Sequence, residues 1–462
     1  MRKLFFTVMA VAVAALVMSG ADWPTQSGSP QRDGWARAEK AFTRENAHKI
    51  ELLYKYKADN QARGLRALTS PMINGMLITY LGFKEMLFFG GSGDNVYAVD
   101  ADLNRMIWKT HFDYKGDKPL ASPTATCPGG LTASLAMPGS SSAAGGRGLG
   151  AAPGRSGLFA TGFGRSGIFI AVSADGYLHA LNTSTGGDKV PPVKFIPPNS
   201  SAGPLIVNEG VIYTATTDNC GGKPNAVYAL DMSGGEGKLS SFAADASGIA
   251  AGTDGTICVQ TKDGLHALTR DLQAKESFKA TDGGSAASPA ASPMASPMVF
   301  QWKGKDAVVW GNLHLLYSGT DAPSRTETTA HSPLTFASWE DAPDGPRWVY
   351  AAAENSVEGF NVEDRNGSPV LKSVWKAGKG GDSMVTANGL LFLLSGGKAP
   401  GGKATLRVLD GLTGKELYSW SAAAYAHDAG LAIANRRIYF TDHSNTVYCL
   451  GFMAEQPQLT GR

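Results

Sequence analysis

The sequence lacks the short motifs that mark several common enzyme classes. Only four cysteines occur in 462 residues, and none stands in a C-x-x-C-H motif, so covalent haem attachment is excluded. No phosphate-binding Walker loop, no H-E-x-x-H and no pattern typical of a serine hydrolase is present. The sequence motifs therefore give no support to nucleotide-dependent, zinc-peptidase or hydrolase chemistry.

The chain also lacks a strong charge of either sign. Its 42 Lys and Arg residues nearly balance 40 Asp and Glu residues, which gives a net charge of +2. A protein with so weak a net field has no electrostatic footprint for nucleic acid. We therefore expect no nucleic-acid partner.

No apolar run is long enough for a membrane span of roughly 20 residues. The longest one, residues 4–17, follows Arg2 and Lys3 and precedes the small residues Ser19 and Ala21. This order is typical of a cleaved secretory signal. We predict a signal peptide over residues 1–21 and a periplasmic or secreted mature chain without a transmembrane span. No cysteine follows the cleavage site, so a lipid anchor is not indicated.

One pattern recurs along the chain: an alternating apolar run, a turn rich in Gly or Asn, and a second run ending on Trp or Phe. It is clearest at residues 96–109, 227–242 and 406–420, and it is typical of a strand, tight turn and strand. About eight copies align on the residue that precedes the turn, at Val99, Leu181, Leu230, Leu268, Leu316, Phe360, Leu409 and Leu450. Their spacing of roughly 40 to 50 residues matches one four-stranded blade of a β-propeller.

We therefore predict an all-β fold, an eight-bladed β-propeller with four-stranded blades, over residues 22–462 as a single domain. Such a ring must close, because an open ring leaves sheet edges unpaired. The last copy lacks its outer strand, and residues 49–57 form an orphan apolar run near the N-terminus. We expect this N-terminal strand to pair with the strand around Tyr448 and complete the last blade. A closed ring buries its own edges, so a monomer is the default.

Two segments of low complexity interrupt the repeats, at about 138–166 and 281–294. Both are rich in Gly, Ala, Ser or Pro and poor in large apolar residues. Such segments cannot bury a core. We predict disordered insertions there rather than hidden blades.

The four cysteines allow at most two disulfides in an oxidising compartment. Cys258 and Cys449 fall inside predicted strands on opposite sides of the ring and are interpreted as small core residues. Cys127 and Cys220 fall in turns of neighbouring blades. For these two, a disulfide and two free thiols both remain open.

The repeat, best seen in LDGLTGKELYSW at residues 409–420, resembles that of the pyrroloquinoline-quinone (PQQ) enzymes. The opening DWPTQSGSPQRDGW at residues 22–35 is similar to the entry segment of such propellers. The resemblance covers nearly the whole mature chain and implies an eight-bladed PQQ-like propeller. It also implies that Trp108, Trp375 and Trp420, at the ends of outer strands, dock against neighbouring blades in a structural role.

Two kinds of function follow from this resemblance. Quinoprotein dehydrogenases hold PQQ and calcium in the central funnel and oxidise alcohols or sugars, whereas outer-membrane assembly propellers bind proteins without a cofactor. The chain lacks the adjacent cysteine pair of many alcohol-oxidising members and the lipid-accepting cysteine of the assembly lipoprotein. We expect a non-catalytic binding or assembly scaffold with an envelope or secreted protein partner and no cofactor. The alternative is a PQQ- and calcium-dependent oxidoreductase.

Candidate functional groups gather where the innermost strands are expected to begin, at one mouth of the central channel. A Ser-Pro dipeptide or a relative marks these strand starts, for example Ser70-Pro71 and Ser296-Pro297. Beside the starts of three late blades stand His331, Asp382, His427 and Asp428. Two imidazoles and two carboxylates are able to bind a divalent metal or to exchange protons. A hydrated channel rim without a special function is the favoured explanation, and neither a metal nor catalytic residues are assigned.

Overall fold

The structure is a computed structural model that describes residues 21–64, 66–79, 82–114, 123–124, 126–138, 167–233, 237–279, 295–318, 324–325, 333–342, 345–396, 401–422, 424, 426 and 430–453. The insertion predicted over 281–294 lies outside these residues, as does the one over 138–166 except for residue 138. The predicted signal peptide lies outside them except for residue 21.

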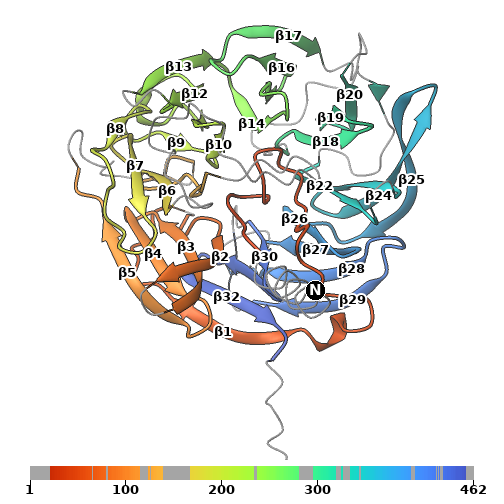
Figure 1. The fold of residues 1–462 in the computed structure, drawn as a ribbon, viewed down its shortest axis with the longest axis horizontal. Helices are drawn as coiled ribbons and strands as arrows, with labels where there is room; N and C mark the ends of the chain where they lie inside the picture. The colour runs from red at the N-terminus through yellow and green to blue at the C-terminus, as the bar shows by residue number, and fades with distance from the viewer. Residues whose placement is uncertain are drawn as a thin grey trace, which may run out of the picture.

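The described residues form eight antiparallel sheets arranged in a ring around a central axis (Figure 1), which confirms the predicted β-propeller. We number these blades 1 to 8 in chain order. Blades 1 to 4 contain β2 (Met72–Thr79), β3 (Gly82–Gly91), β4 (Asn95–Asp100) and β5 (Arg105–His111); β6 (Ile168–Val172), β7 (Tyr177–Asn182) and β8 (Val193–Lys194); β9 (Ser201–Ala202), β10 (Ile206–Asn208), β11 (Val211–Thr217), β12 (Ala226–Asp231) and β13 (Lys238–Ala243); and β14 (Ala246–Ala251), β15 (Ile257–Thr261), β16 (Gly264–Leu268) and β17 (Ala274–Lys279).

Blades 5 to 8 continue the ring in the same way. They contain β18 (Met298–Trp302), β19 (Lys305–Trp310), β20 (His314–Tyr317) and β21 (Ser324–Arg325); β22 (Thr335–Glu340), β23 (Arg347–Ala352), β24 (Ser356–Arg365) and β25 (Ser368–Gly378); β26 (Ser383–Ala387), β27 (Leu390–Ser395), β28 (Thr405–Asp410) and β29 (Glu416–Ser421); and β30 (Ala432–Ala434), β31 (Arg437–Thr441), β32 (Thr446–Gly451) and β1 (Glu51–Lys57). Two short 3-10 helices, η1 (Ala47–Lys49) and η2 (Cys220–Gly222), complete the described elements.

The repeat in the sequence corresponds to the third strand of each blade. All eight residues that precede the predicted turns lie in β4, β7, β12, β16, β20, β24, β28 and β32. The middle strands are buried because both of their faces pack against neighbouring blades. The outer strands alternate exposed and half-buried positions, as β5 and β13 do.

Blade 2 departs from the regular pattern at its inner edge. Its sheet has three strands, and the innermost place is taken by one antiparallel bridge between Ala136 and Ile170. The two backbone hydrogen bonds of this bridge measure 2.7 and 3.2 Å. The segment around Ala136 therefore acts as a minimal fourth strand.

The predicted closure of the ring is confirmed. Strand β1 pairs antiparallel with β32, and Lys55 lies opposite Tyr448. The last blade thus combines the two ends of the chain, so the ring has no open seam. Phe42, just before β1, packs against Phe392 and Phe452 with ring centroids 5.2 and 5.0 Å apart.

Before β1 begins, the chain crosses the middle of the ring (Figure 1). We call residues 21–39 the collar. The collar meets the blades in their order around the ring, through backbone or side-chain hydrogen bonds. The contacts join Trp23 to Ile73, Pro24 to Met137, Thr25 to Leu205, Pro30 to Ala251, Gln31 to Val299, Asp33 to Ser338, Gly34 to Thr386 and Glu39 to Arg436.

The collar lies at one level of the channel. In four blades its contact is the third residue after the Ser at the strand start: Ile73, Met137, Val299 and Thr386 follow Ser70, Ser134, Ser296 and Ser383. Gly34 has φ +62°, and a Cβ there would come within 3.0 Å of the Ala337 Cβ and 3.1 Å of the Met384 carbonyl oxygen. A side chain at this position would therefore push the collar off the blades.

Candidate functional site

Of the four residues predicted at the channel mouth, only Asp382 is among the described residues. His331, His427 and Asp428 lie outside them. The Asp382 backbone amide donates to the Leu394 carbonyl at 3.0 Å. Its side chain lines a pocket of about 210 Å³ between blades 6 and 7, together with Glu354, Lys379 and Arg407.

This pocket is shaped by backbone rather than by large side chains. A Cβ on Gly380 would meet the Ala353 carbonyl oxygen at 1.7 Å, and one on Gly381 would meet the Leu394 carbonyl oxygen at 2.4 Å. Only glycine fits at either position. With two acidic and two basic side chains on its wall, the pocket suits a polar group of a partner better than an apolar one.

A quinone with bound calcium, which the alternative function needs, requires several oxygen ligands around one point. Among the described residues, no three His, Cys, Asp or Glu side chains come close enough together to hold a metal ion. The collar also crosses the channel at the level of the inner strands. The described residues therefore do not provide the ligand set of that cofactor.

The structure does assemble one chain of groups that the sequence motifs did not predict. In blade 2 the Ser173 Oγ lies 3.2 Å from the His179 Nε2, and the His179 Nδ1 lies 3.0 Å from an Asp188 carboxylate oxygen. Ser, His and Asp in series are the groups of a serine hydrolase. The sequence motifs did not reveal it because Asp188 reaches His179 from a loop and the three residues form no known short motif.

This chain of groups does not form an open active site. Ser173 and His179 are buried, and the ring of Phe112 stacks on His179 at 3.9 Å. The Ser173 hydroxyl donates its proton to a hydrogen bond with Asp175 in the same turn, so it does not donate to His179. Blade 8 has a comparable buried network, in which Asp442 accepts from the Tyr448 hydroxyl at 2.7 Å. Both networks brace the turn between the second and third strands.

The collar carries buried charge into the channel. The Arg32 guanidinium is fully enclosed and donates to the carbonyl oxygens of Gln26 and Pro204 at 2.6 and 3.0 Å. Burial lowers its pKa to about 9. The Asp33 carboxylate, also buried, accepts from the Ser29 hydroxyl at 2.9 Å and pairs with Arg37.

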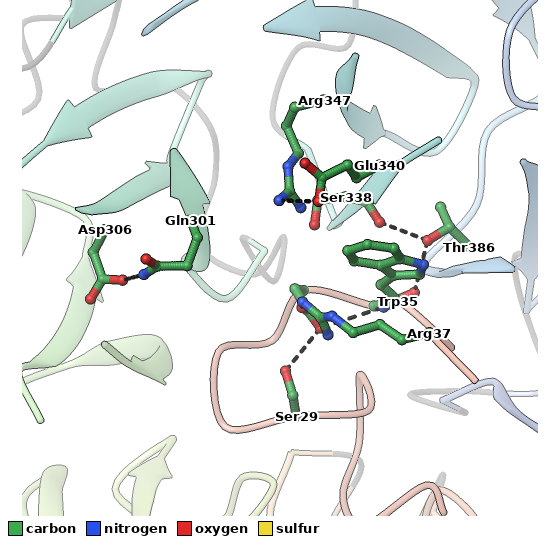
Figure 2. Close-up of polar contacts among 11 residues, drawn as sticks. Ser29, Trp35, Arg37, Gln301, Asp306, Ser338, Glu340, Arg347 and Thr386 are labelled. Atoms are coloured by element: carbon green, nitrogen blue, oxygen red, sulfur yellow. Dashed lines mark hydrogen bonds and ion pairs between the residues drawn. The ribbon is translucent and has the colours of Figure 1, made fainter. Parts of the chain in front are cut away.

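A second buried arginine faces the collar from blade 6 (Figure 2). The Arg347 Nη2 donates to the Glu340 Oε2 at 2.9 Å. Its guanidinium carbon lies 5.4 Å from the ring centroid of Trp35, and that of Arg37 lies 4.3 Å from the same ring. Two cations thus flank one indole. Burial lowers the pKa of Arg347.

The three tryptophans that the resemblance assigns to docking all touch the next blade. Trp108 Nε1 donates to the Thr183 carbonyl at 3.0 Å, and Trp375 Nε1 donates to the Gly411 carbonyl at 2.8 Å. The ring of Trp420 meets that of Tyr448 edge-on at 5.4 Å. Each of these contacts joins adjacent blades.

Cys127 and Cys220 form a disulfide in the structure, with Cα atoms 5.4 Å apart. It joins the segment after blade 1 to a turn of blade 3, a separation of 93 residues. Cys258 and Cys449 are free and buried.

Comparisons with known proteins identify the fold. The chain resembles a quinohemoprotein alcohol dehydrogenase from Comamonas testosteroni at 12% identity, covering 96% of this chain and 82% of that one, with a TM-score of 0.56. A europium-containing methanol dehydrogenase matches at 12% identity over 94% and 98% of the two chains, with a TM-score of 0.57. BamB from Moraxella catarrhalis matches at 14% identity over 88% and 99%, with a TM-score of 0.50.

No family model matches the sequence, and no curated protein matches it either. At such low identity, the likenesses show the fold and nothing finer. In the part of the chain that the structure describes, no helix is long and apolar enough to cross a membrane. The chain has the fold shared by PQQ dehydrogenases and BamB-like eight-bladed propellers.

Proposed function

We propose that this protein is an exported PQQ-like propeller that binds a protein partner of the cell envelope without catalysing a reaction. The observation that carries the proposal is the collar, which bonds to all eight blades and crosses the middle of the ring. The faces and rim of the ring then remain for recognition.

Two further features support a scaffold. The one Ser-His-Asp series among the described residues is closed by burial and by a competing hydrogen bond. The pocket beside Asp382 is lined by charged side chains and glycine backbone, which suits a polar group on another protein. BamB, a propeller of the same fold, is consistent with a binding role in the envelope. A cleaved signal over residues 1–21 and a single domain over 22–462 belong to this proposal.

The test compares the two functions on the same purified mature protein. PQQ and calcium are added, and quinone absorbance and dye-linked oxidation of alcohols and sugars are recorded. We expect neither binding nor turnover. Oxidation that depends on both additions would overturn the proposal in favour of a quinoprotein dehydrogenase.

A second experiment looks for the partner directly. A photocrosslinking residue replaces Asn355, on the wall of the pocket, or Lys372, on the exposed outer strand β25. We expect one discrete adduct from position 355 in intact cells and none from position 372. Adducts that are the same from both positions, or absent from both, would contradict a partner at the pocket face.

A further inference from the structure

The dipeptide Asn-Gly occurs three times in the sequence, beginning at Asn74, Asn366 and Asn388. An asparagine before glycine can lose its side-chain amide without an enzyme, because the glycine residue has no Cβ to hinder the attack of its nitrogen on the asparagine Cγ. The sequence alone does not distinguish the three sites. The structure separates them by what each side chain contacts.

Asn366 lies at the tip of the hairpin of β24 and β25, at the rim of the ring (Figure 1). Strand β23 pairs with β24 only as far as Asn361. We call residues 362–371, beyond that pair, the arm; in the part of the chain that the structure describes, it has two strands. Its inner face packs into the apolar cluster at the seam of blades 5 and 6 through Val362 and Leu371. The tip extends beyond these contacts.

The turn at the tip of the arm has the backbone of a two-residue hairpin turn. Asn366 and Gly367 have φ of +54° and +84°, and the flanking Arg365 pairs with Ser368. Both turn residues are exposed, and a Cβ on Gly367 would meet nothing within 4 Å. Among the described residues, the Asn366 side chain has no hydrogen-bond partner. Its amide is therefore free to rotate and open to water.

The other two asparagines are held by hydrogen bonds. Asn388 occupies a turn of the same kind, with φ of +47° there and +77° at the next residue. Its Nδ2 donates to the carbonyl oxygens of Lys40 and Phe42 at 3.2 and 2.9 Å, in the segment after the collar. Asn74 is buried, and its Oδ1 accepts from the Met76 amide at 3.3 Å. Reaction at either site must first break these contacts.

We propose that Asn366 is a site of spontaneous deamidation in the folded protein. The Gly367 nitrogen attacks the Asn366 Cγ, the new C–N bond closes a succinimide ring, and the side-chain nitrogen leaves as ammonia with the proton of the Gly367 amide. Water then opens the ring to aspartate or isoaspartate, so no oxidant or reductant is needed. In the folded turn the Gly367 N–H donates to the Asp364 Oδ1 at 2.8 Å, so the tip must open first. Exposed loop tips open at little cost in free energy.

The product changes the arm in two ways. It adds a negative charge to a tip that already carries Glu363 and Asp364. Isoaspartate also lengthens the backbone of the turn by one carbon, which a two-residue turn between paired strands does not accommodate. The pairing of Arg365 with Ser368 should therefore be lost first. This reaction needs no partner and is independent of the proposed function.

The test incubates mature protein at pH 8 in native buffer and, in parallel, in guanidinium chloride that unfolds it. Peptide mapping by mass spectrometry follows amide loss at each of the three sites, and an isoaspartate-specific methyltransferase labels the isomerised product in each peptide. The unfolded chain supplies the intrinsic rate of each site, so differences in neighbouring sequence cancel. We expect folding to slow the reaction of Asn388 at least about tenfold more than that of Asn366, equivalent to about 1.4 kcal/mol of opening free energy.

The matched control is Asn366→Gln, because glutamine keeps a side-chain amide but would have to close a larger ring. This variant should show neither amide loss nor label in the arm peptide, and its Asn74 and Asn388 should still react in the unfolded chain. The proposal is wrong if folded protein keeps Asn366 intact while the unfolded chain loses that amide. It is also wrong if Asn74 or Asn388 reacts as fast as Asn366 in folded protein, or if the arm peptide of Asn366→Gln is still labelled.

Discussion

An arginine paired with a glutamate lies at each of two seams between blades, and the two seams differ in what remains unpaired. At the seam of blades 8 and 1, the Arg437 Nη1 bonds both Glu85 at 3.0 Å and Asp102 at 2.8 Å, and the Tyr439 hydroxyl donates to Glu85 at 3.1 Å. At the seam of blades 5 and 6, the Arg347 Cζ lies 5.9 Å from the ring centroid of Phe300. Arg347 bonds Glu340 of its own blade through one nitrogen, and its other two nitrogens are unpaired among the described residues.

The two seams also differ in their surroundings. The two ends of the chain meet inside blade 8, and the polar groups that it turns toward blade 1 are satisfied by the protein alone. The seam of blades 5 and 6 contains an apolar cluster that includes Phe300 and Phe336.

Removal of one arginine at a time should give the largest contrast. At pH 8, Arg437→Met leaves Glu85 buried without its cation and should lower the free energy of unfolding by about 3–5 kcal/mol. Arg347→Met should cost only about 1–2 kcal/mol, because it also removes two unpaired donors and Glu340 is partly exposed. Urea unfolding measures both. Equal losses would erase the distinction between the seams.

Loss of the disulfide should lower the free energy of unfolding by the same amount whether or not either arginine has been replaced. Cys127→Ser together with Cys220→Ser opens a loop of 93 residues, which should lower the free energy of unfolding by about 2–4 kcal/mol. The same loss should occur in the Arg437→Met and Arg347→Met backgrounds, because distant sites add. A double-mutant cycle by urea unfolding checks this; strong coupling to either arginine would contradict it.

The closing seam should also respond to pH. Burial raises the pKa of Glu85 to about 7, although Arg437 pulls in the opposite direction. The folded protein then keeps this proton to higher pH than the unfolded chain, whose carboxyl titrates near 4.5. The free energy of unfolding should therefore fall by about 1–3 kcal/mol between pH 5 and pH 8. The fall should shrink in Glu85→Gln; an unchanged profile in that variant would assign it to other groups.

The docking tryptophans lie at other seams between blades. Their replacement should have the smallest effects on stability. Trp375→Phe leaves the Gly411 carbonyl without its donor at 2.8 Å and should cost about 1–2 kcal/mol. Trp420→Phe keeps the edge contact with Tyr448 and should cost less than about 1 kcal/mol. Thermal unfolding of the two variants, side by side, tests the order. The reverse order would mean that ring volume outweighs the hydrogen bond.

The ring was predictable from sequence because each blade repeats one local pattern. The alternating apolar residues before the turn at Leu409 can be recognised in the sequence. The same is true of the unpaired apolar run at residues 49–57, which forms β1. Blade 2 shows the limit of this approach. Its innermost strand is reduced to a bridge at Ala136, within a Gly- and Ser-rich stretch that carries no strand signal.

The polar centre of the molecule was not predictable in the same way. The expectation placed functional groups at the strand starts, and of these only Asp382 falls among the described residues, in a pocket between blades. The groups beside the collar, Arg32, Trp35 and Arg347, are far apart in sequence or lie in a loop with no periodic pattern. A charged Arg-Asp pair within a Gly- and Ser-rich loop was the one available sign that this loop would be buried.

The collar has a consequence for the size of the ring. It offers one anchoring position to each blade in turn, from Trp23 at the first to Glu39 at the last. A duplicated blade would find no anchor, and a deleted one would leave an anchor without its strand. The sequence of anchoring positions in this leading segment therefore matches a ring of eight blades.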